Sequence, residues 1–241
     1  SLLIVMLMLA SLVPFGTISA SAVESISGDG TPGNPYLIGT PEGLKKFREI
    51  VNGGQYGAYA KLISDIEINP GIECGTSGYL GDKEPEENKN YIIKYFEGVF
   101  DGQGHTISGL YNNKYTQEAG LFYHPTGAVI KNLNIDRSYI KSFLYGGMIS
   151  VATDTTVINC HSNAYYDSRG EEIEIGGMAG RAYNSKFISC TNTGQITSYH
   201  YHRCEQRFGG IVGRAENYTF VDCENTGKLD ANEYNMGLSF F

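Results

Sequence analysis

Two arginines in the sequence could bind an anionic group. Arg181 and Arg214 each lie five residues after the start of a glycine-rich segment, where two related segments carry Val151 and His124. Guanidinium groups pair with carboxylates and phosphates, so one interpretation is a small ladder that grips an anionic sugar or lipid. Two guanidinium groups stacked about 5 Å apart repel by less than ~1 kcal/mol in water, so they need no partner. We favour a structural role, in which each arginine binds carbonyls or acids at a corner.

Three residues close together in sequence resemble a metal-binding cluster. They are His200, His202 and Cys204, in the segment that makes one repeat longer than the others. The H-x-H-x-C spacing is tight and a fourth ligand is missing, whereas structural zinc sites use four ligands. The sequence therefore favours a solvated loop, and we expect neither a metal nor a cofactor.

Acid–base catalysis has one candidate pair, Asp101 and His105. Their Asp-Gly and Gly-His neighbours are explained by a tight turn. Glycan-cleaving sites need paired carboxylates, or Ca²⁺-binding acids, on neighbouring strands. No acidic residue recurs at equivalent repeat positions, since Asp222 is matched by Ser189, Asn159 and Asn132. We expect no catalytic residue; a polysaccharide lyase or glycoside hydrolase is the alternative.

Tyrosine is the most abundant aromatic residue, with 18 copies and no tryptophan. Tyr165, Tyr166, Tyr199 and Tyr201 lie in stretches that differ between repeats, where we expect exposed loops. Tyrosine supplies amphipathic contact area that suits sugars or proteins. These four tyrosines and the two arginines are therefore the candidate binding residues.

An internal repeat must position these side chains. Four similar segments start at residues 119, 146, 176 and 209, spaced 27, 30 and 33 residues apart. Fourteen residues after each start comes an apolar side chain, in order Leu133, Cys160, Cys190 and Cys223. Each repeat thus has a first part of constant length and a second part of variable length, which is typical of a solenoid coil with a loop insertion. We expect these four side chains to form an inward-facing ladder in which the cysteines are free thiols.

The strands of each coil follow from the pattern around this ladder. In most repeats two adjacent apolar residues and then one polar residue come before the ladder position. Two adjacent apolar residues break the strict alternation of a strand, which predicts a bulge or bend. Further on, Asn192 with Gly194, and Asn225 with Gly227, predict a turn, because Asn and Gly tolerate positive φ. Asn192 and Asn225 could stack as an amide ladder. Coils of this length hold about three strands of 4–6 residues, so the fold class is all-β.

The flanking segments complete the domain. Thr40 and Pro41 predict a helix start, and Gly53 with Gly54 its end, giving an amphipathic cap for the open end of the solenoid. Residues 60–68 predict a strand, and 69–95 a long surface loop. Residues 1–22 predict a secretory signal peptide whose basic n-region is missing. Residues 23–241 then form one domain, with a truncated repeat starting at 236.

Composition limits the function classes. The chain is acidic, with 26 Asp and Glu against 18 Lys and Arg and a net charge of −8. It has no basic run, so we exclude nucleic acid as a partner. The apolar run at residues 2–12 is too short to span a bilayer, so we expect a secreted or cell-surface protein without a membrane span in its mature chain. Pairing of Cys74 with Cys204 stays open.

The glycine-rich starts and the Cys-Thr-Asn-Thr-Gly turn at residues 190–194 resemble the GLUG repeat of bacterial exported proteins. Residues 28–38 and 100–110 resemble the segments that precede those repeats. The resemblance covers residues 28–241, although Leu133, Val151 and Thr153 depart from the pattern. It implies a right-handed parallel β-helix related to the pectate-lyase-like fold, used modularly on bacterial surfaces, including beside a protease that cleaves immunoglobulin A. The resemblance assigns no catalytic residue to this chain.

Together, these observations predict a non-catalytic, adhesin-like surface module. Its partner would be a host or cell-wall glycan or protein, and further domains would follow it in the natural polypeptide.

Overall fold

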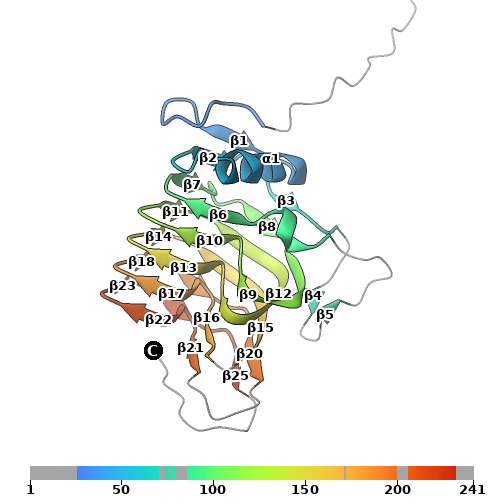
Figure 1. The fold of residues 1–241 in the computed structure, drawn as a ribbon, viewed down its shortest axis with the longest axis vertical. Coiled ribbons are helices and arrows are strands. Elements are labelled where there is room, and N and C mark those ends of the chain that lie inside the picture. The colour runs from blue at the N-terminus through green and yellow to red at the C-terminus, as the bar shows by residue number, and fades with distance from the viewer. Residues whose placement is uncertain are drawn as a thin grey trace, which may run out of the picture.

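The protein is a parallel β-solenoid with one helix at its N-terminal end (Figure 1). The computed structural model describes residues 26–70, 74–75, 78–79, 86–170, 172–199 and 206–231. Successive coils stack their strands into three parallel sheets, which confirms the expected fold class. The segment predicted as a signal peptide, the predicted repeat start at 236 and Tyr201 lie outside the described residues.

The three sheets contain seven, five and eleven strands. The seven-stranded sheet consists of β1 (Tyr36–Ile38), β2 (Tyr59–Leu62), β7 (Val99–Asp101), β11 (Val129–Lys131), β14 (Thr156–Ile158), β18 (Lys186–Ile188) and β23 (Thr219–Val221). The five-stranded sheet consists of β6 (Ile93–Phe96), β10 (Phe122–Pro125), β13 (Ile149–Thr153), β17 (Ala179–Tyr183) and β22 (Val212–Glu216). The eleven-stranded sheet consists of β3 (Ile66–Glu67), β8 (Thr106–Ser108), β9 (Tyr111–Ala119), β12 (Asn134–Gly146), β15 (His161–Arg169), β16 (Glu174–Gly176), β19 (Thr191–Asn192), β20 (Ile196–Tyr199), β21 (Arg207–Gly209), β24 (Glu224–Asn225) and β25 (Leu229–Ala231). Outside these sheets lie the helix α1 (Pro41–Asn52), the 3₁₀ turn η1 (Asn88–Asn90), and the antiparallel pair β4 (Cys74–Gly75) and β5 (Gly78–Tyr79).

A ladder of in-register side chains fills the core behind the seven-stranded sheet. Strand pairing aligns Tyr36, Ala60, Phe100, Ile130, Val157, Phe187 and Phe220. All but Phe220 are buried. Full burial of one such apolar side chain contributes about 1.5–3 kcal/mol, so stacked coils share the stabilisation that no single coil could supply.

Polar residues with positive φ turn the chain at the corner before the Leu133–Cys223 ladder. Asn132, Asn159, Ser189 and Asp222 have φ values of 52°, 49°, 52° and 51°. This left-handed conformation is more accessible to Asn and Asp than to most residues. The interruption of strict alternation expected from the sequence is therefore a bend in every coil.

The two turn glycines are required by close packing between coils, not by positive φ as the sequence suggested. A Cβ atom on Gly194 would lie 2.1 Å from the carbonyl oxygen of Ala164, and one on Gly227 would lie 2.0 Å from the carbonyl oxygen of Gly194. Asn192 Nδ2 donates to Asn225 Oδ1 at 2.8 Å, so the amide ladder expected there does form.

The N-terminal helix covers one end of the solenoid. Thr40 Oγ1 accepts a hydrogen bond from the Gly43 N–H, and Pro41 occupies the first turn, as predicted. Leu44, Phe47 and Val51 are buried, and the Phe47 ring contacts the rings of Tyr36, Phe96 and Phe100. No helix among the described residues is long and apolar enough to cross a membrane.

Two predicted boundaries are wrong. The segment expected as one strand at 60–68 divides into β2 and β3, which belong to different sheets, because the chain turns a corner between them. The loop expected to reach residue 95 ends earlier, since β6 begins at Ile93. Ile93 and Phe96 are buried in the core, so this part of the polar-flanked segment is a solenoid strand.

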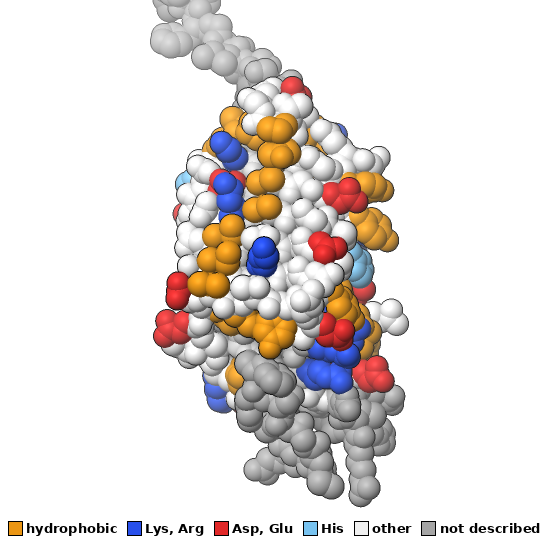
Figure 2. Space-filling view, turned by 90° about the vertical axis from the view of Figure 1, so that its left-hand side faces the viewer, with side chains coloured by type: hydrophobic (Ala, Val, Ile, Leu, Met, Phe, Trp, Pro, Cys, Tyr) orange, Lys and Arg blue, Asp and Glu red, His pale blue; other side chains and the backbone are white. Residues whose placement is uncertain are grey.

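The outward face of the seven-stranded sheet carries hydrophobic side chains in stripes along the solenoid (Figure 2). Pairing places Ile158, Ile188 and Val221 in one row, and Val221 is 43% exposed. Charged side chains interrupt these stripes in Figure 2. The outward rows of this sheet mix aliphatic with charged side chains, among them Asp101 and Lys131, which form an ion pair at 3.1 Å.

The structure places Leu133, Cys160 and Cys190 in the core, with Cys223 packed against it, and the three cysteines are free. The Cys160 Sγ lies 3.4 Å from the carbonyl oxygen of Ile158, and the Cys190 Sγ lies 3.4 Å from that of Ile188. Burial raises the pKa of both thiols, that of Cys190 to about 12. Neither thiol therefore forms the reactive thiolate near neutral pH.

We expect Cys160 and Cys190 to resist alkylation in the native protein, because they are buried and stay protonated. Cys223 is only partly buried, so it should react first of the three. After denaturation without reductant, all three should react. Peptide mapping by mass spectrometry after timed iodoacetamide treatment measures each site separately. A Cys160–Cys190 disulfide in the denatured, unreduced sample would contradict the free-thiol ladder.

Candidate functional site

Outward side chains of the long strands form parallel columns across the eleven-stranded sheet. On β12, Tyr139, Lys141, Phe143 and Tyr145 alternate with inward residues such as Ile140 and Ser142, which are buried. In-register pairing continues each column onto neighbouring coils. Lys141 aligns with Asp167, and Tyr145 aligns with Glu118 on one side and with Glu174 on the other. We call this surface the columnar face.

The first column is a stack of tyrosines. Tyr111, Tyr139 and Tyr165 are in register, and the Tyr139 and Tyr165 rings lie 5.3 Å apart at an interplanar angle of 9°. Their exposed fractions are 5%, 4% and 9%, so they form a small cluster separate from the main core. The prediction that Tyr165 is exposed on a loop is wrong, because it is stacked within a strand.

Tyr166 is also not an exposed binding residue. Adjacent strand residues face opposite sides of a sheet, so Tyr166 points inward where Tyr165 points outward. It is fully buried, and its hydroxyl oxygen lies 3.0 Å from Ser162 Oγ and 3.2 Å from the Gly177 carbonyl oxygen. Both tyrosines belong to β15, which runs through a stretch expected to be a loop.

The second column carries a buried carboxylate, which we call the Asp167 cluster. The Tyr115 hydroxyl donates to Asp167 Oδ2 at 3.0 Å, and the Tyr139 hydroxyl lies 3.3 Å from the same oxygen. Arg169 Nε lies 3.8 Å from Asp167 Oδ1. Burial, together with the negative Asp167, raises the pKa of both tyrosines, so they remain hydroxyl donors. Burial lowers the pKa of Lys141.

An exposed aromatic ring lies next to this cluster. Phe143 is 46% exposed, and its ring centroid lies 5.1 Å from that of Tyr115. Lys141 Nζ and Arg169 Cζ lie 5.1 Å and 5.2 Å from the Tyr115 ring centroid, at cation–π distance. The exposed Phe143 ring is therefore packed on a tyrosine ring that two cationic side chains approach.

The Glu174 cluster lies at the other end of the columnar face, where β16 meets β17. Glu174 is 1% exposed and pairs with three arginines. Arg181 donates through Nε and through Nη2, the latter at 2.5 Å, while Arg207 Nη1 and Arg214 Nη1 lie 3.0 Å and 3.5 Å from Oε1. Arg181 Cζ also lies 4.8 Å from the centroid of the Tyr145 ring. The acid expected as a structural partner of Arg181 and Arg214 is thus one shared carboxylate.

The remaining candidates lie apart from these clusters. Asp101 accepts from the Gln103 N–H and from Asn132 Nδ2 and pairs with Lys131, so its pKa is lowered although burial alone would raise it. His105 Nδ1 lies 3.2 Å from Asp65 Oδ1, so Asp101 and His105 each have other partners. His200, His202 and Cys204 lie outside the described residues, and no metal-binding group of His, Cys, Asp or Glu occurs within them.

Tyr199 ends β20, and its backbone pairs in register with that of Arg169. Of the tyrosines singled out in the sequence, Tyr165 lies on the columnar face, whereas Arg181 and Arg214 belong to β17 and β22 of the five-stranded sheet.

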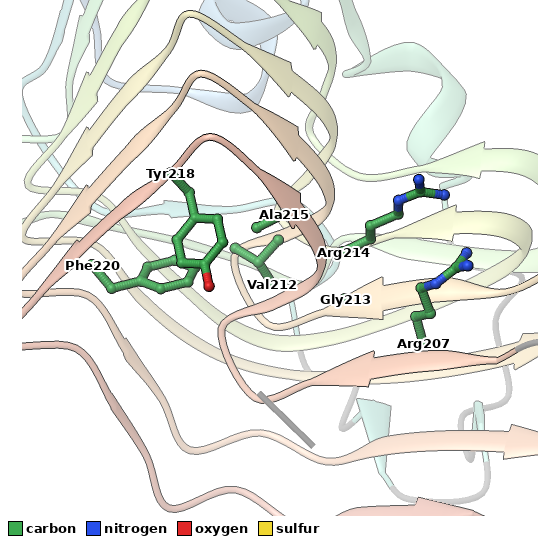
Figure 3. Close-up of a pocket in the computed structure, with 7 residues that line it drawn as sticks. All are labelled: Arg207, Val212, Gly213, Arg214, Ala215, Tyr218 and Phe220. Atoms are coloured by element: carbon green, nitrogen blue, oxygen red, sulfur yellow. The ribbon is translucent and has the colours of Figure 1, made fainter. Parts of the chain in front are cut away.

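A pocket of about 130 Å³ opens at the last described coil. Figure 3 shows Arg207 and Arg214 projecting in the same direction, away from the rings of Tyr218 and Phe220. Val212 and Phe220 align with the buried Ala179 and Phe187 of the preceding coil. The apolar part of the pocket is therefore the continuation of the solenoid core.

Sequence reasoning missed Asp167, Glu174, Tyr115 and Phe143. A signal for the face existed, because Tyr139, Lys141, Phe143 and Tyr145 follow a period of two. Asp167 and Glu174 gave no recurring signal, because the equivalent positions of neighbouring coils carry other residue types. Tyr145 and Arg207, for example, are in register with Glu174.

Comparison with known proteins gives distant similarity. No family model matches the chain. A protein provisionally named a Gly-rich membrane protein, from Evansella cellulosilytica, is 31% identical over 117 residues, which are 47% of this chain and 12% of that protein. Halomucin of Haloquadratum walsbyi is 26% identical over 176 residues, which are 71% of this chain and 2% of halomucin. The chain thus matches only a small part of each relative's length.

A solved structure from Bacteroides ovatus, provisionally named an immunoglobulin A1 protease, has a TM-score of 0.48 and 17% identity. The alignment covers 88% of this chain and 81% of that one.

Proposed function

We propose that this chain is a non-catalytic, surface-displayed repeat module that binds glycans through its columnar face. The observation that carries the proposal is the exposed Phe143 ring packed on the ring of Tyr115, which Lys141 and Arg169 approach at cation–π distance. A sugar presents an apolar C–H face and a rim of hydroxyl groups. An aromatic ring offers matching apolar area, and the surrounding side chains supply hydrogen-bond donors.

The state of the carboxylates supports a binding role over hydrolysis or elimination. A glycosidase needs one carboxylic acid whose pKa is raised and a second carboxylate that attacks or activates water. Asp167 accepts two tyrosine hydroxyls beside Arg169, and Glu174 is enclosed by three guanidinium groups. Both carboxylates are therefore engaged in internal hydrogen bonds and ion pairs, which suits a structural role.

The setting is part of the same proposal. The repeats resemble the GLUG motif, and the apolar N-terminal run resembles a secretory signal, so we place the module outside a bacterial cell. The much greater length of the two relatives, one of them named a membrane protein, supports its use within a larger polypeptide.

The test is a binding screen of the full chain against immobilised neutral and acidic polysaccharides. Phe143→Ala should weaken binding about tenfold, or about 1.4 kcal/mol, because it removes the exposed ring. Tyr95→Ala is the matched control, since Tyr95 is 54% exposed but lies on β6 of the five-stranded sheet, outside the columnar face. Equal losses in both variants, binding only to proteins, or release of shortened glycan would contradict the proposal.

A further inference from the structure

We infer that Asn217 is an acceptor site for an N-linked glycan, attached while the chain is exported. The inference rests on the extracellular setting proposed above, and it does not depend on glycan binding at Phe143. It starts from the tripeptide Asn217-Tyr218-Thr219. Transferases that attach N-linked glycans recognise Asn followed two positions later by Ser or Thr, with any residue but Pro between them. No other asparagine in the 241-residue sequence has this pattern.

The fold places this tripeptide at an exposed corner of the last described coil. Asn217 lies in the turn between β22 and β23, and all three residues are exposed, with Tyr218 at 50%. The φ angle of Asn217 is 50°, a left-handed conformation that Asn adopts more readily than most residues. A glycan is bulky and must project into solvent, so a surface turn is where one can be attached.

The preceding coils supply an internal comparison. Asp154 and Asn184 occupy the same corner, each with a φ of 48°, and Asn184 is adjacent to Asn217 in the stack. Asp154 is followed two positions later by Thr156, but it has no side-chain amide to carry a sugar. Asn184 has the amide, but Lys186 stands in place of the hydroxyl residue. Of these three corners, only that of the last described coil combines the amide with the hydroxyl.

The side-chain nitrogen of Asn217 is available for the reaction. Nδ2 donates one hydrogen bond, to Asn184 Oδ1 at 2.7 Å, and no second acceptor for it lies among the described residues. An amide nitrogen carries two N–H groups, so one is left to be replaced. In the reaction, Nδ2 forms a bond to C1 of the sugar as C1 separates from the diphosphate of a lipid-linked donor. The diphosphate leaves with the electron pair of the broken bond, Nδ2 loses one proton, and the remaining N–H can still donate to Asn184.

The surroundings of Asn217 also favour a hydrophilic cover. Tyr218, Phe220 and Val221 are 50%, 37% and 43% exposed, and the ring centroids of Tyr218 and Phe220 lie 4.9 Å apart. Exposed apolar patches promote association in solution. A glycan is hydrophilic and solubilising, so one attached beside these side chains would shield them.

The experiment secretes the full chain from cultured eukaryotic cells behind a host secretion signal, with a C-terminal Asn-Ala-Thr tag that reports action of the transferase. Peptide-N-glycosidase in heavy-oxygen water converts each glycosylated Asn to a labelled Asp, which peptide mass spectrometry locates. We expect the label at Asn217 in most secreted chains and none at Asn184. Thr219→Ala should abolish it, whereas Thr219→Ser keeps the hydroxyl and should retain it. Thr156→Ala is the matched control, because it removes the equivalent hydroxyl at the Asp154 corner and should leave the label at Asn217 unchanged.

An unmodified Asn217 in chains whose tag is modified would overturn the inference. Modification that persists in Thr219→Ala would overturn it as well, because it would not depend on the recognised pattern. The polysaccharide screen is run on the same secreted chain, so that the two proposals fail separately. Loss of polysaccharide binding with Asn217 modified would contradict the proposed function alone, and binding with Asn217 unmodified would contradict this inference alone.

Discussion

Replacing Glu174 by glutamine will lower the free energy of unfolding by about 3–5 kcal/mol, the cost of breaking a buried ion pair by removing one partner. Glu174 is 1% exposed and forms ion pairs with Arg181, Arg207 and Arg214. The substitution keeps the shape of the side chain but removes its charge. Three guanidinium groups would then lie together without the carboxylate they share.

Urea denaturation monitored by circular dichroism measures the change. Glu216→Gln is the control, because it removes an equally charged group from a single exposed pair with Arg214. That control should cost less than about 1 kcal/mol. A double variant, Glu174→Gln with Arg181→Met, should recover part of the loss, because it removes one of the stranded charges. If Glu174→Gln costs no more than the control, the buried carboxylate does not hold the cluster together.

The repeat pattern predicted the fold because a solenoid translates sequence offsets into spatial neighbours. Residues fourteen positions after each repeat start do stack, and Arg181 pairs in register with Arg214 as their equal offsets require. The helix was predicted correctly because Thr40 and Pro41 are local signals that need no knowledge of tertiary packing.

The strands that exceed ordinary length were not predicted. β12 has 13 residues and β9 and β15 have nine each, against the 4–6 expected. Two inward serines of β12, Ser138 and Ser142, explain the discrepancy. Ser138 Oγ accepts from the Leu110 N–H and donates to the Asp136 carbonyl oxygen, while Ser142 Oγ donates to Ser168 Oγ of the next coil at 3.2 Å. Polar residues that would mark a loop in most sequences are therefore compatible with a buried strand here.

The candidate site could be predicted only in part for a related reason. Equal repeat offsets identified the column of Arg181 and Arg214 but not Glu174, which lies on the preceding strand. Contacts between two columns depend on how β16 meets β17 at the corner, and no sequence offset encodes that angle. The predicted exposure of Tyr165 was wrong because Tyr139 of the preceding coil, in the same column, stacks on its ring.

Phe187→Ala should cost about 3–5 kcal/mol of unfolding free energy, whereas Phe220→Ala should cost about 1–2 kcal/mol, although both rings occupy the same column. Phe187 pairs in register with Phe220 and is fully buried, while Phe220 is 37% exposed in the last described coil. The Phe187 ring packs against Phe220 at a centroid distance of 5.5 Å, so its removal opens a cavity between coils.

The comparison tests whether stability is a sum over coil interfaces. Each variant is measured by urea denaturation, and native-state hydrogen exchange then locates the loss. Amides of β18 should exchange more slowly than those of β23 in the unmodified protein, because coils cover β18 on both sides. Phe187→Ala should speed exchange in both strands, whereas Phe220→Ala should affect mainly β23. Equal costs for the two substitutions, with uniform exchange across both strands, would show that the solenoid unfolds as one unit and that position along its axis does not set the contribution of a core ring.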